Sequence, residues 1–379
     1  MALKVRGILQ SPQIKHITAA FSSSPVYTAV FSYLSSPDLI RSGRTCRTLY
    51  RASSDFCSRA YNIYRHLSWF FTDPLAFRSL QAQTGTLISG SNALQFLDRT
   101  FYSESDLDLF TFHDATPEVA NYLQREGYHF VKEGDQPSTF KAAFDLIVPP
   151  DNADIRGIRP FDKYRFSGVS GVFNFLKDNG QKVQVVSTTT SPLHCILCFH
   201  STCVMNFITF EGAYSLYPKA TFDARIGITQ GWITERETTA IGKYALRGWR
   251  ILIGTWPHQE ELINAIFAFS TLRYVGDKYC WIVPFDTTNV KLRVPHTAST
   301  PPFTSDPAMF NSWTLENESY IETETRFMPV RSTLLRYKYL TADNGFLITL
   351  YSFFKMQGTF EHTKVEGMSV EEKAKAWTW

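Results

Sequence analysis

The sequence predicts an α+β fold in three parts: a small helical unit at residues 20–66, a mixed sheet with flanking helices at residues 67–260, and a C-terminal region at 261–379 with a helix and many strands. Three observations lead to this prediction. Apolar residues recur at helical spacing near the N-terminus, strand-like and helical segments alternate in the middle, and strand-like runs dominate the C-terminal region. A hydrophobic content of 44% over 379 residues is enough for two or three units with cores of their own.

Composition and charge narrow the class of protein. The chain has 38 basic and 35 acidic residues, and a net charge of +3 is too small for the basic surface that duplex nucleic acid selects. No run approaches the roughly 20 apolar residues that span a bilayer, and the first residues lack the apolar segment of a secretory signal. Six unevenly spaced cysteines are typical of reduced thiols. We therefore expect a soluble intracellular protein, cytoplasmic or nuclear, with no membrane partner.

Two Ser-Pro pairs mark helix starts in the N-terminal unit. Ser24 with Pro25, and Ser36 with Pro37, each place a capping residue before a proline at the first helical position. Apolar side chains at helical spacing follow the first pair: Val26, Val30, Phe31 and Leu34. The pattern predicts two or three short helices.

These helices resemble the F-box, in which a leading proline, an amphipathic helix ending in leucine, a short break and a helix with a Cys-Arg pair follow one another. The matching residues are Pro25, Val30, Phe31, Leu34, Asp38, Leu39, Arg44, Cys46 and Leu49. The resemblance implies docking on the adaptor subunit of cullin-type ubiquitin ligases through an amphipathic helix. The implied partner-binding residues are Pro25, Val30, Phe31, Leu34 and Leu39. The alternative interpretation is a helical hairpin packed on its own domain.

A glycine-rich corner opens the second part of the chain. The expected elements are a strand ending at Ile88, a turn at 89–91, a helix at 92–99 and a strand at 106–112. Alternation along the last strand puts Asp106 and Asp108 on one face, and Leu107 and Leu109 in the core. Two carboxylates held so close repel each other, and the usual resolutions are a shared proton or a bound cation.

This order of elements resembles the nucleotidyltransferase fold of the polymerase beta type over roughly residues 67–260. The resemblance implies that Gly90 and Ser91 hold the phosphates of a nucleoside triphosphate (NTP). It also implies that Asp106 and Asp108 are the catalytic carboxylates that bind Mg²⁺. The alternative is a solvated strand edge, or a pair of aspartates that cap nearby backbone.

The sequence departs from the family at the third carboxylate. Asn179 and Gly180 form the strongest hairpin turn signal in the chain, and the strand after them should carry the missing acid. The polar residue there is Gln184, whose amide brings no negative charge and takes no proton from an attacking hydroxyl. Asp145 is the other candidate for this role.

Basic residues follow in a segment predicted to be helical, at 234–252. Lys243, Arg247 and Arg250 are spaced to share one helical face, where they would meet a triphosphate or an acidic partner. The alternative is a solvated face paired with Glu235 and Glu237.

The stretch at 194–203 contains residue types that bind zinc: His194, Cys195, Cys198, His200 and Cys203. It is apolar and lacks a tight turn between Cys195 and Cys198. We therefore predict buried thiols and no zinc site. The C-terminal region is expected to contain a helix at 257–272 and a final hairpin at 335–354, and it either forms a separate domain or completes the preceding one.

Taken together, the chain resembles a group of fungal proteins that join an F-box-like start to a nucleotidyltransferase-like body. The stretches SGSNALQFLDR, ESDLDLF, FHSTCVMN and KYALRGW carry this resemblance. It implies an adaptor that recognises substrates for a ubiquitin ligase, built on a degenerate domain that still binds a nucleotide. The alternative is an active Mg²⁺-dependent enzyme that moves a nucleotidyl group from an NTP to an acceptor.

Overall fold

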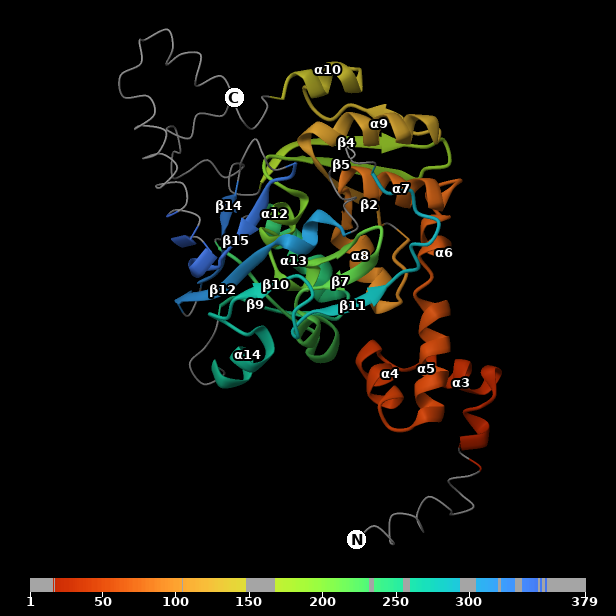
Figure 1. The fold of residues 1–379 in the computed structure, drawn as a ribbon. Helices are drawn as coiled ribbons and strands as arrows, with labels where there is room; N and C mark the ends of the chain where they lie inside the picture. The colour runs from red at the N-terminus through yellow and green to blue at the C-terminus, as the bar shows by residue number, and fades with distance from the viewer. Residues whose placement is uncertain are drawn as a thin grey trace.

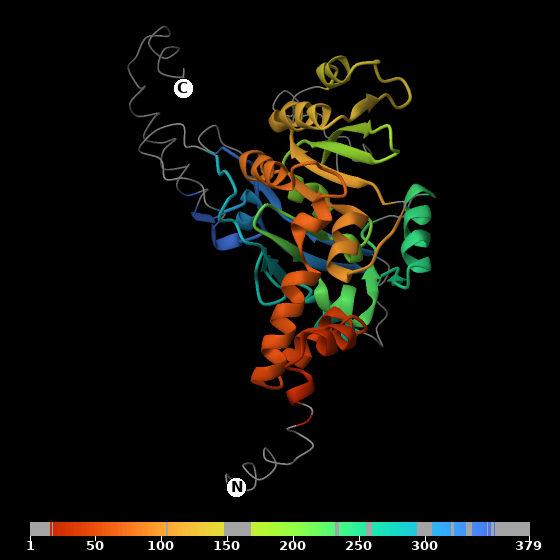
Figure 2. The same cartoon turned by 90° about the vertical axis from the view of Figure 1, so that its right-hand side faces the viewer.

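The chain has an α+β fold, in which a helical unit projects from one end of a body built around a mixed sheet (Figures 1 and 2). The computed structural model describes residues 16, 18–103, 105–147, 168–231, 235–254, 260–293, 305–319, 322–330, 336–346, 348, 349 and 352. The α+β class predicted from the sequence is thereby confirmed.

Two helices of the helical unit have a proline in their first turn, α3 (Ser24–Phe31) and α4 (Ser36–Gly43). The longer helix α5 (Arg47–Ala60) follows them, and then the short helix α6 (Ile63–Leu67). Two caps lie one residue earlier than predicted, at Ser23 and Ser35, and the Ser35 hydroxyl accepts the amide of Asp38 at 3.2 Å. A small apolar cluster of its own holds the unit together: Tyr27, Phe31, Leu39, Ala52 and Phe56.

The boundary between this unit and the body lies at the end of α5. Ile63 and Leu67 of α6 are buried in the large core of the body, whereas Phe56 of α5 belongs to the small cluster. α6 therefore packs with the body, although it follows α5 almost directly.

The body is built on one sheet with strand order β11-β7-β6-β1-β2-β5-β4-β3. Its strands are β1 (Leu87–Ser89), β2 (Leu107–Phe112), β3 (His129–Val131), β4 (Val169–Leu176), β5 (Lys182–Thr188), β6 (Asn206–Ile208), β7 (Gly212–Ser215) and β11 (Trp281–Pro284). β2 and β5 are parallel and the other neighbours are antiparallel. The predicted hairpin at Asn179 and Gly180 is confirmed, because it joins β4 to β5 and Gly180 has a φ of +85°.

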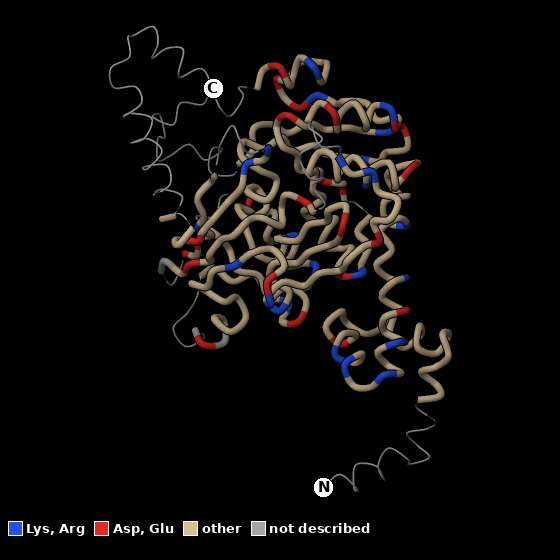
Figure 3. Tube along the Cα trace, viewed as in Figure 1, with Lys and Arg blue, Asp and Glu red and all other residues tan. Residues whose placement is uncertain are grey.

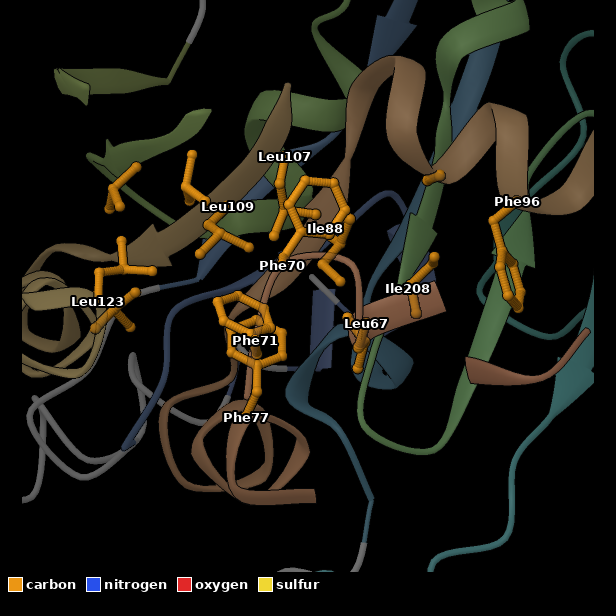
Figure 4. Close-up of a cluster of buried hydrophobic side chains, with 14 of the residues drawn as sticks. Leu67, Phe70, Phe71, Phe77, Ile88, Phe96, Leu107, Leu109, Leu123 and Ile208 are labelled. Carbon is orange, nitrogen blue, oxygen red and sulfur yellow. The ribbon is translucent and has the colours of Figure 1, made fainter. Parts of the chain in front are cut away.

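Alternation along the strands gives the sheet two apolar faces. Leu107 and Leu109 lie in the cluster that packs against α7 (Pro74–Thr84), α8 (Gly90–Asp98), α9 (Thr116–Arg125) and α10 (Phe140–Asp145). Figure 4 shows both leucines in this cluster with Phe71 and Leu123. Phe110 points to the other face and packs with α12 (Pro192–Leu197) and α14 (Glu260–Phe267).

The C-terminal region completes the body, since its strand β11 pairs with β7 at the edge of the main sheet. Smaller sheets contain β8 (Ile226–Ile228), β9 (Arg250–Leu252), β10 (Arg273–Tyr274), β12 (Ser312–Ser319), β13 (Glu322–Arg326), β14 (Met328–Val330) and β15 (Tyr339–Thr341). None of the described helices is long and apolar enough to cross a membrane.

The predicted hairpin at 335–354 is wrong in its described part. β15 pairs with β14, and residues 344–346 are helical. A local helix cap explains the difference. The carboxylate of Asp343 accepts a hydrogen bond of 3.0 Å from the amide of Phe346, which favours a helical turn over a strand. Residues 335, 347, 350, 351, 353 and 354 of that prediction, and 257–259 of the predicted helix at 257–272, lie outside the described residues.

Candidate functional site

The glycine-rich corner joins β1 directly to α8. Ser89 ends the strand, and Gly90 begins the helix with a φ of +67°. A Cβ atom added to Gly90 would lie 2.4 Å from Oδ2 of Asp108. Glycine is therefore needed twice, for the positive φ and for the close approach of the backbone to the carboxylate.

Asp108 belongs to a polar row that crosses the sheet. It pairs with Ser89 on β1 and with Gln184 on β5, and Gln184 pairs with Asn174 on β4. Paired residues on neighbouring strands point to the same face, so these side chains share one side of the sheet. The Gln184 amide donates to Oδ1 of Asn174 at 3.0 Å, and Asn174 donates to Oε2 of Glu133 at 2.7 Å.

Asp106 and Asp108 have different electrostatic surroundings. Asp106 forms an ion pair with Lys182 at 2.8 Å, in which the side chains are 38% and 37% exposed. Burial raises the pKa of Asp108 to about 7, the charge of Asp106 adds to this effect, and Lys182 and Lys243 oppose it. Asp108 therefore keeps its proton to a higher pH than an ordinary aspartate does.

Lys243 lies on α13 (Glu235–Leu246) and acts on Asp108 through its charge. Arg247 follows the helix, with its guanidinium carbon 3.7 Å from the centre of the Tyr102 ring. Tyr102 itself belongs to the loop between α8 and β2. Both predicted basic residues therefore flank the corner, on the side of the loop that precedes Asp106.

The prediction that Arg250 shares a helical face with these two residues is wrong, because α13 ends at Leu246 and Arg250 lies on β9. Gly248 has a φ of +97° and the amide of Trp249 bonds to the carbonyl of Tyr244, which is a helix stop built on glycine.

Ser91 lies in the first turn of α8, where its hydroxyl shares a hydrogen bond of 2.7 Å with the hydroxyl of Ser105. Ser105 directly precedes Asp106 in the chain. The bond therefore ties the helix start to the strand that carries the two aspartates. The residues predicted to meet phosphate and metal, Gly90, Ser91, Asp106 and Asp108, lie around one corner.

Of the two candidates for the third acid position, Gln184 is the one beside Asp108. Asp145 ends α10, and Phe140 and Phe144 of that helix pack against Phe173 with ring centres 5.1 and 6.1 Å away. Phe173 alternates with Asn174 along β4 and points to the opposite face of the sheet. Asp145 is also half exposed and forms an ion pair with Lys141 at 3.1 Å.

The donor set suits a single magnesium ion that arrives with phosphates. Mg²⁺ is usually held by one or two carboxylates together with substrate phosphates and water. Asp106 and Asp108 could supply the carboxylates, and Gln184 would add an amide oxygen but no charge. Within the described residues, no group of three or more His, Cys, Asp or Glu side chains is placed to hold a metal. A site for two metals, with three carboxylates, does not fit these residues.

Sequence reasoning missed three residues of this site: Lys182, Asn174 and Glu133. Lys182 lies two residues before Gln184 on β5. Side chains alternate along a strand, so both point to the same face of the sheet once the strand is known. Asn174 and Glu133 depend on the register of β3, β4 and β5, which no local pattern reveals.

The cysteine-rich stretch is partly helical, and two of its three cysteines are buried. Cys195 lies in α12 and Cys203 in the short helix Thr202–Val204, and both side chains are buried. Burial raises the pKa of Cys195, and raises that of Cys198 to about 12 and that of Cys203 to about 11. Such thiols resist the deprotonation that zinc binding requires.

In the helical unit, the five predicted partner residues divide into two groups. Phe31 and Leu39 are each 1% exposed and form the core of the unit, and Leu34 packs against that core. Pro25 and Val30 are exposed on α3. Other exposed apolar residues of the helical unit are Val26, Tyr33 and Tyr50, which had not been predicted as partner residues.

The corner is a small polar site on a mixed-charge surface. Figure 3 shows basic and acidic residues interspersed along the chain of the body. Neither a protein-family model, nor a curated protein, nor a solved structure matches the chain. The function is therefore inferred from the site itself.

Proposed function

We propose that the body binds a nucleoside triphosphate with one Mg²⁺ at the corner formed by Gly90 and Asp108. We also propose that the helical unit is an F-box-like module that docks on the adaptor subunit of a cullin-type ubiquitin ligase. The observation that carries the first proposal is the approach of the α8 backbone to Asp108, which leaves no room for a Cβ atom at position 90. On this proposal the protein is a binding and recruitment factor.

The first turn of α8 provides the phosphate contacts. The amide groups at the start of a helix attract anions, and α8 begins at Gly90 with Ser91 as its next residue. The positive charges of Lys182 and Lys243 act on the same corner. Asp106, Asp108 and the Gln184 oxygen would hold the metal, whose charge would offset that of the phosphates.

Gln184 favours binding over transfer. In a nucleotidyl transfer, the third acid accepts the proton of the attacking hydroxyl, and an amide cannot do this. One observation favours the second candidate, an active nucleotidyltransferase: Gly90, Ser91, Asp106 and Asp108 lie around one corner, as the resemblance implies for such an enzyme. Incorporation of labelled nucleotide into an acceptor, with Mg²⁺ or Mn²⁺, would support this second candidate.

The nucleotide proposal is tested by calorimetric titration of the full chain with each NTP and Mg²⁺. We expect saturable binding that is lost in the Asp106→Ala/Asp108→Ala double variant. Asp145→Ala is the matched control, because it removes a carboxylate from the opposite face of the sheet, and it should bind as the parent does. Equal binding by parent and double variant, or no binding by the parent, would contradict the proposal.

The docking proposal is tested by co-purification of the adaptor and cullin subunits from cells. Val30 is 42% exposed, so Val30→Asp puts a charge on the α3 surface without disturbing the core, and we expect both subunits to be lost. Leu246→Asp is the control, since Leu246 is 92% exposed on α13. Absence of both subunits from the parent preparation would rule out this role.

A further inference from the structure

A cavity of about 190 Å³ lies at the far end of β2 and β5 from Asp108. The two parallel strands end there, at Phe112 and Thr188, and both residues line the cavity. In open sheets with parallel strands, ligands bind in the crevice beyond the carboxyl ends of the strands. The cavity has the position of such a crevice.

Three cations from the C-terminal region line this cavity: Arg293, Arg336 and Lys338. Nη1 of Arg293 donates to the carbonyl of Gln83 at 2.8 Å, which fixes that guanidinium. The Arg336 guanidinium carbon lies 5.3 Å from the centre of the Tyr337 ring. The Arg293 guanidinium is therefore held by the protein before any ligand binds, and Arg336 lies beside it on the cavity lining.

The cavity floor is rigid and polar. Tyr337 packs on Phe112 with ring centres 4.9 Å apart. Residues 188–190 are three threonines that line the cavity, and Thr188 is anchored by its hydroxyl, which donates to the carbonyl of Thr111 at 2.8 Å. The threonine that follows it, Thr189, donates its amide to the carbonyl of Gly168 at 2.8 Å.

Two carboxylates complete the lining, Asp114 from the short helix His113–Ala115 and Glu118 from α9. They come from the central part of the chain, whereas the cations come from its C-terminal region. An anion without hydrogen-bond donors, such as sulfate, would gain nothing from these carboxylates, and inorganic phosphate offers them only its own hydroxyl. A ligand with an anionic group and separate hydrogen-bond donors would engage both kinds of side chain.

We propose that this cavity binds a small phosphate monoester whose organic part carries an amino or hydroxyl group. Arginine binds phosphate oxygens in a bidentate way, so Arg293 and Arg336 take the phosphate together with Lys338. Asp114 and Glu118 accept hydrogen bonds from the organic part. The volume is below the roughly 300–1,000 Å³ of most drug-sized ligand sites, which favours a small ester over a nucleotide.

This site is separate from the proposed nucleotide site. Asp108 and Phe112 are on the same strand, about 13 Å apart at about 3.3 Å per residue. None of the residues assigned to the NTP and Mg²⁺ lines the cavity. Failure of either proposal therefore leaves the other untouched.

The test is calorimetric titration of the full chain with phosphoethanolamine, glycerol 3-phosphate and inorganic phosphate. We expect both esters to bind saturably, and more tightly than inorganic phosphate. Arg336 is exposed, so Arg336→Ala should fold normally and weaken the binding of both esters by about tenfold or more, the effect of losing a charged hydrogen bond. Arg51→Ala, which removes an exposed arginine of the helical unit, should leave the affinity unchanged.

A second variant tests the role of the carboxylates. Glu118→Gln should weaken the binding of phosphoethanolamine and leave inorganic phosphate bound at least as tightly as before. The proposal is overturned if no ester binds at millimolar concentration, or if Arg336→Ala binds the esters as the parent does. Binding of inorganic phosphate as tight as that of the esters would overturn the assignment to an ester.

Discussion

Gly90 is the residue on which the geometry of the corner depends. Its φ of +67° is strained for any other residue, and the missing Cβ is what allows Asp108 to lie against the helix start. Gly180, in the β4–β5 turn, also has a positive φ, but a Cβ there would meet nothing within 4 Å. A substitution at Gly180 therefore changes stability through the backbone conformation alone. A substitution at Gly90 adds the steric contact with Asp108.

We therefore predict that Gly90→Ala destabilises the protein more than Gly180→Ala. Gly180→Ala, the control, should lower the free energy of unfolding by roughly 1–2 kcal/mol, the penalty of a left-handed backbone for a residue with a Cβ. Gly90→Ala should cost about 1 kcal/mol or more beyond this, because the methyl group displaces Asp108, and it should also abolish NTP binding. Urea unfolding of both variants measures the difference, and equal costs would show that the contact with Asp108 has no energetic weight.

At this scale the sequence predicts the placement of Gly90, Asp106 and Asp108, because a turn and a strand alternation are local patterns. It leaves both Asp145 and Gln184 as candidates for the third acid position, because only the pairing of β2 with β5 decides between them. Lys182 was missed for the same reason, since its partner Asp106 lies on a neighbouring strand.

Among the elements, the short helix Pro307–Phe310 has an unusual cap. Oδ1 of Asp306 accepts the amide of Ala308 at 2.9 Å, and the amide of Asp306 donates to Glu211 at 3.0 Å in the turn between β6 and β7. Asp306 is fully buried, and this burial, with the charge of Glu211, raises its pKa to about 7. The cap thus contains a carboxyl that stays protonated in the folded state at mildly acidic pH.

This shift predicts that the folded state loses stability as the pH rises from about 4 to about 7. In that window the folded state binds more protons at Asp306 than the unfolded state does, so raising the pH favours unfolding. Asp306→Asn keeps the cap acceptor and removes the charge. It should flatten this part of the stability profile and increase stability at pH 8 by up to about 4 kcal/mol.

Urea unfolding at a series of pH values checks this prediction. Asp286→Asn is a control of opposite sign, because hydrogen bonds from Thr288 lower the pKa of that exposed aspartate. Ionised Asp286 therefore contributes stability at neutral pH, which its substitution should reduce. A parent profile that does not change between pH 4 and 7 after correction for the other acids would contradict the assignment to Asp306.

Elements bounded by local signals were predictable, and those bounded by distant contacts were not. Asn179 and Gly180 predict the β4–β5 hairpin. The Ser-Pro pairs predict the starts of α3 and α4 to within one residue. The end of α13 was not predicted, although Gly248 signals it. The helical spacing of the basic residues continues past this glycine, whereas the helix does not. The edge strand β11 was not recognised, since it pairs with a strand far away in the sequence.

For the whole molecule, Arg99 joins the helical unit to the body. Its guanidinium donates to the carbonyl of Phe31 at 3.3 Å and to that of Leu34, and it lies over the rings of Phe56 and Tyr61 at 5.6 and 6.0 Å. Arg99 follows α8, which begins at the proposed nucleotide site. One helix therefore connects the corner at its N-terminus with the helical unit at its C-terminus.

A second contact across the same junction is an ion pair, which is weaker because it is exposed to solvent. Arg41 and Asp223 form an ion pair at 2.5 Å, but their side chains are 56% and 43% exposed. Exposed ion pairs contribute little, typically between about 0 and 1 kcal/mol. The two arginines thus offer a matched comparison of a packed and an exposed link.

We predict that Arg99→Ala loosens the helical unit without unfolding the body. The substitution removes charged hydrogen bonds to two carbonyl groups and the packing on two rings, a loss of roughly 2 kcal/mol or more. Amide hydrogen exchange should become faster in α3 and stay unchanged in β2, and Arg41→Ala should alter neither. If α3 exchanges at the same rate in Arg99→Ala and in the parent, the other contacts across the junction, such as the hydrogen bond from the Ser36 hydroxyl to the carbonyl of Leu97 at 3.1 Å, hold the unit without Arg99.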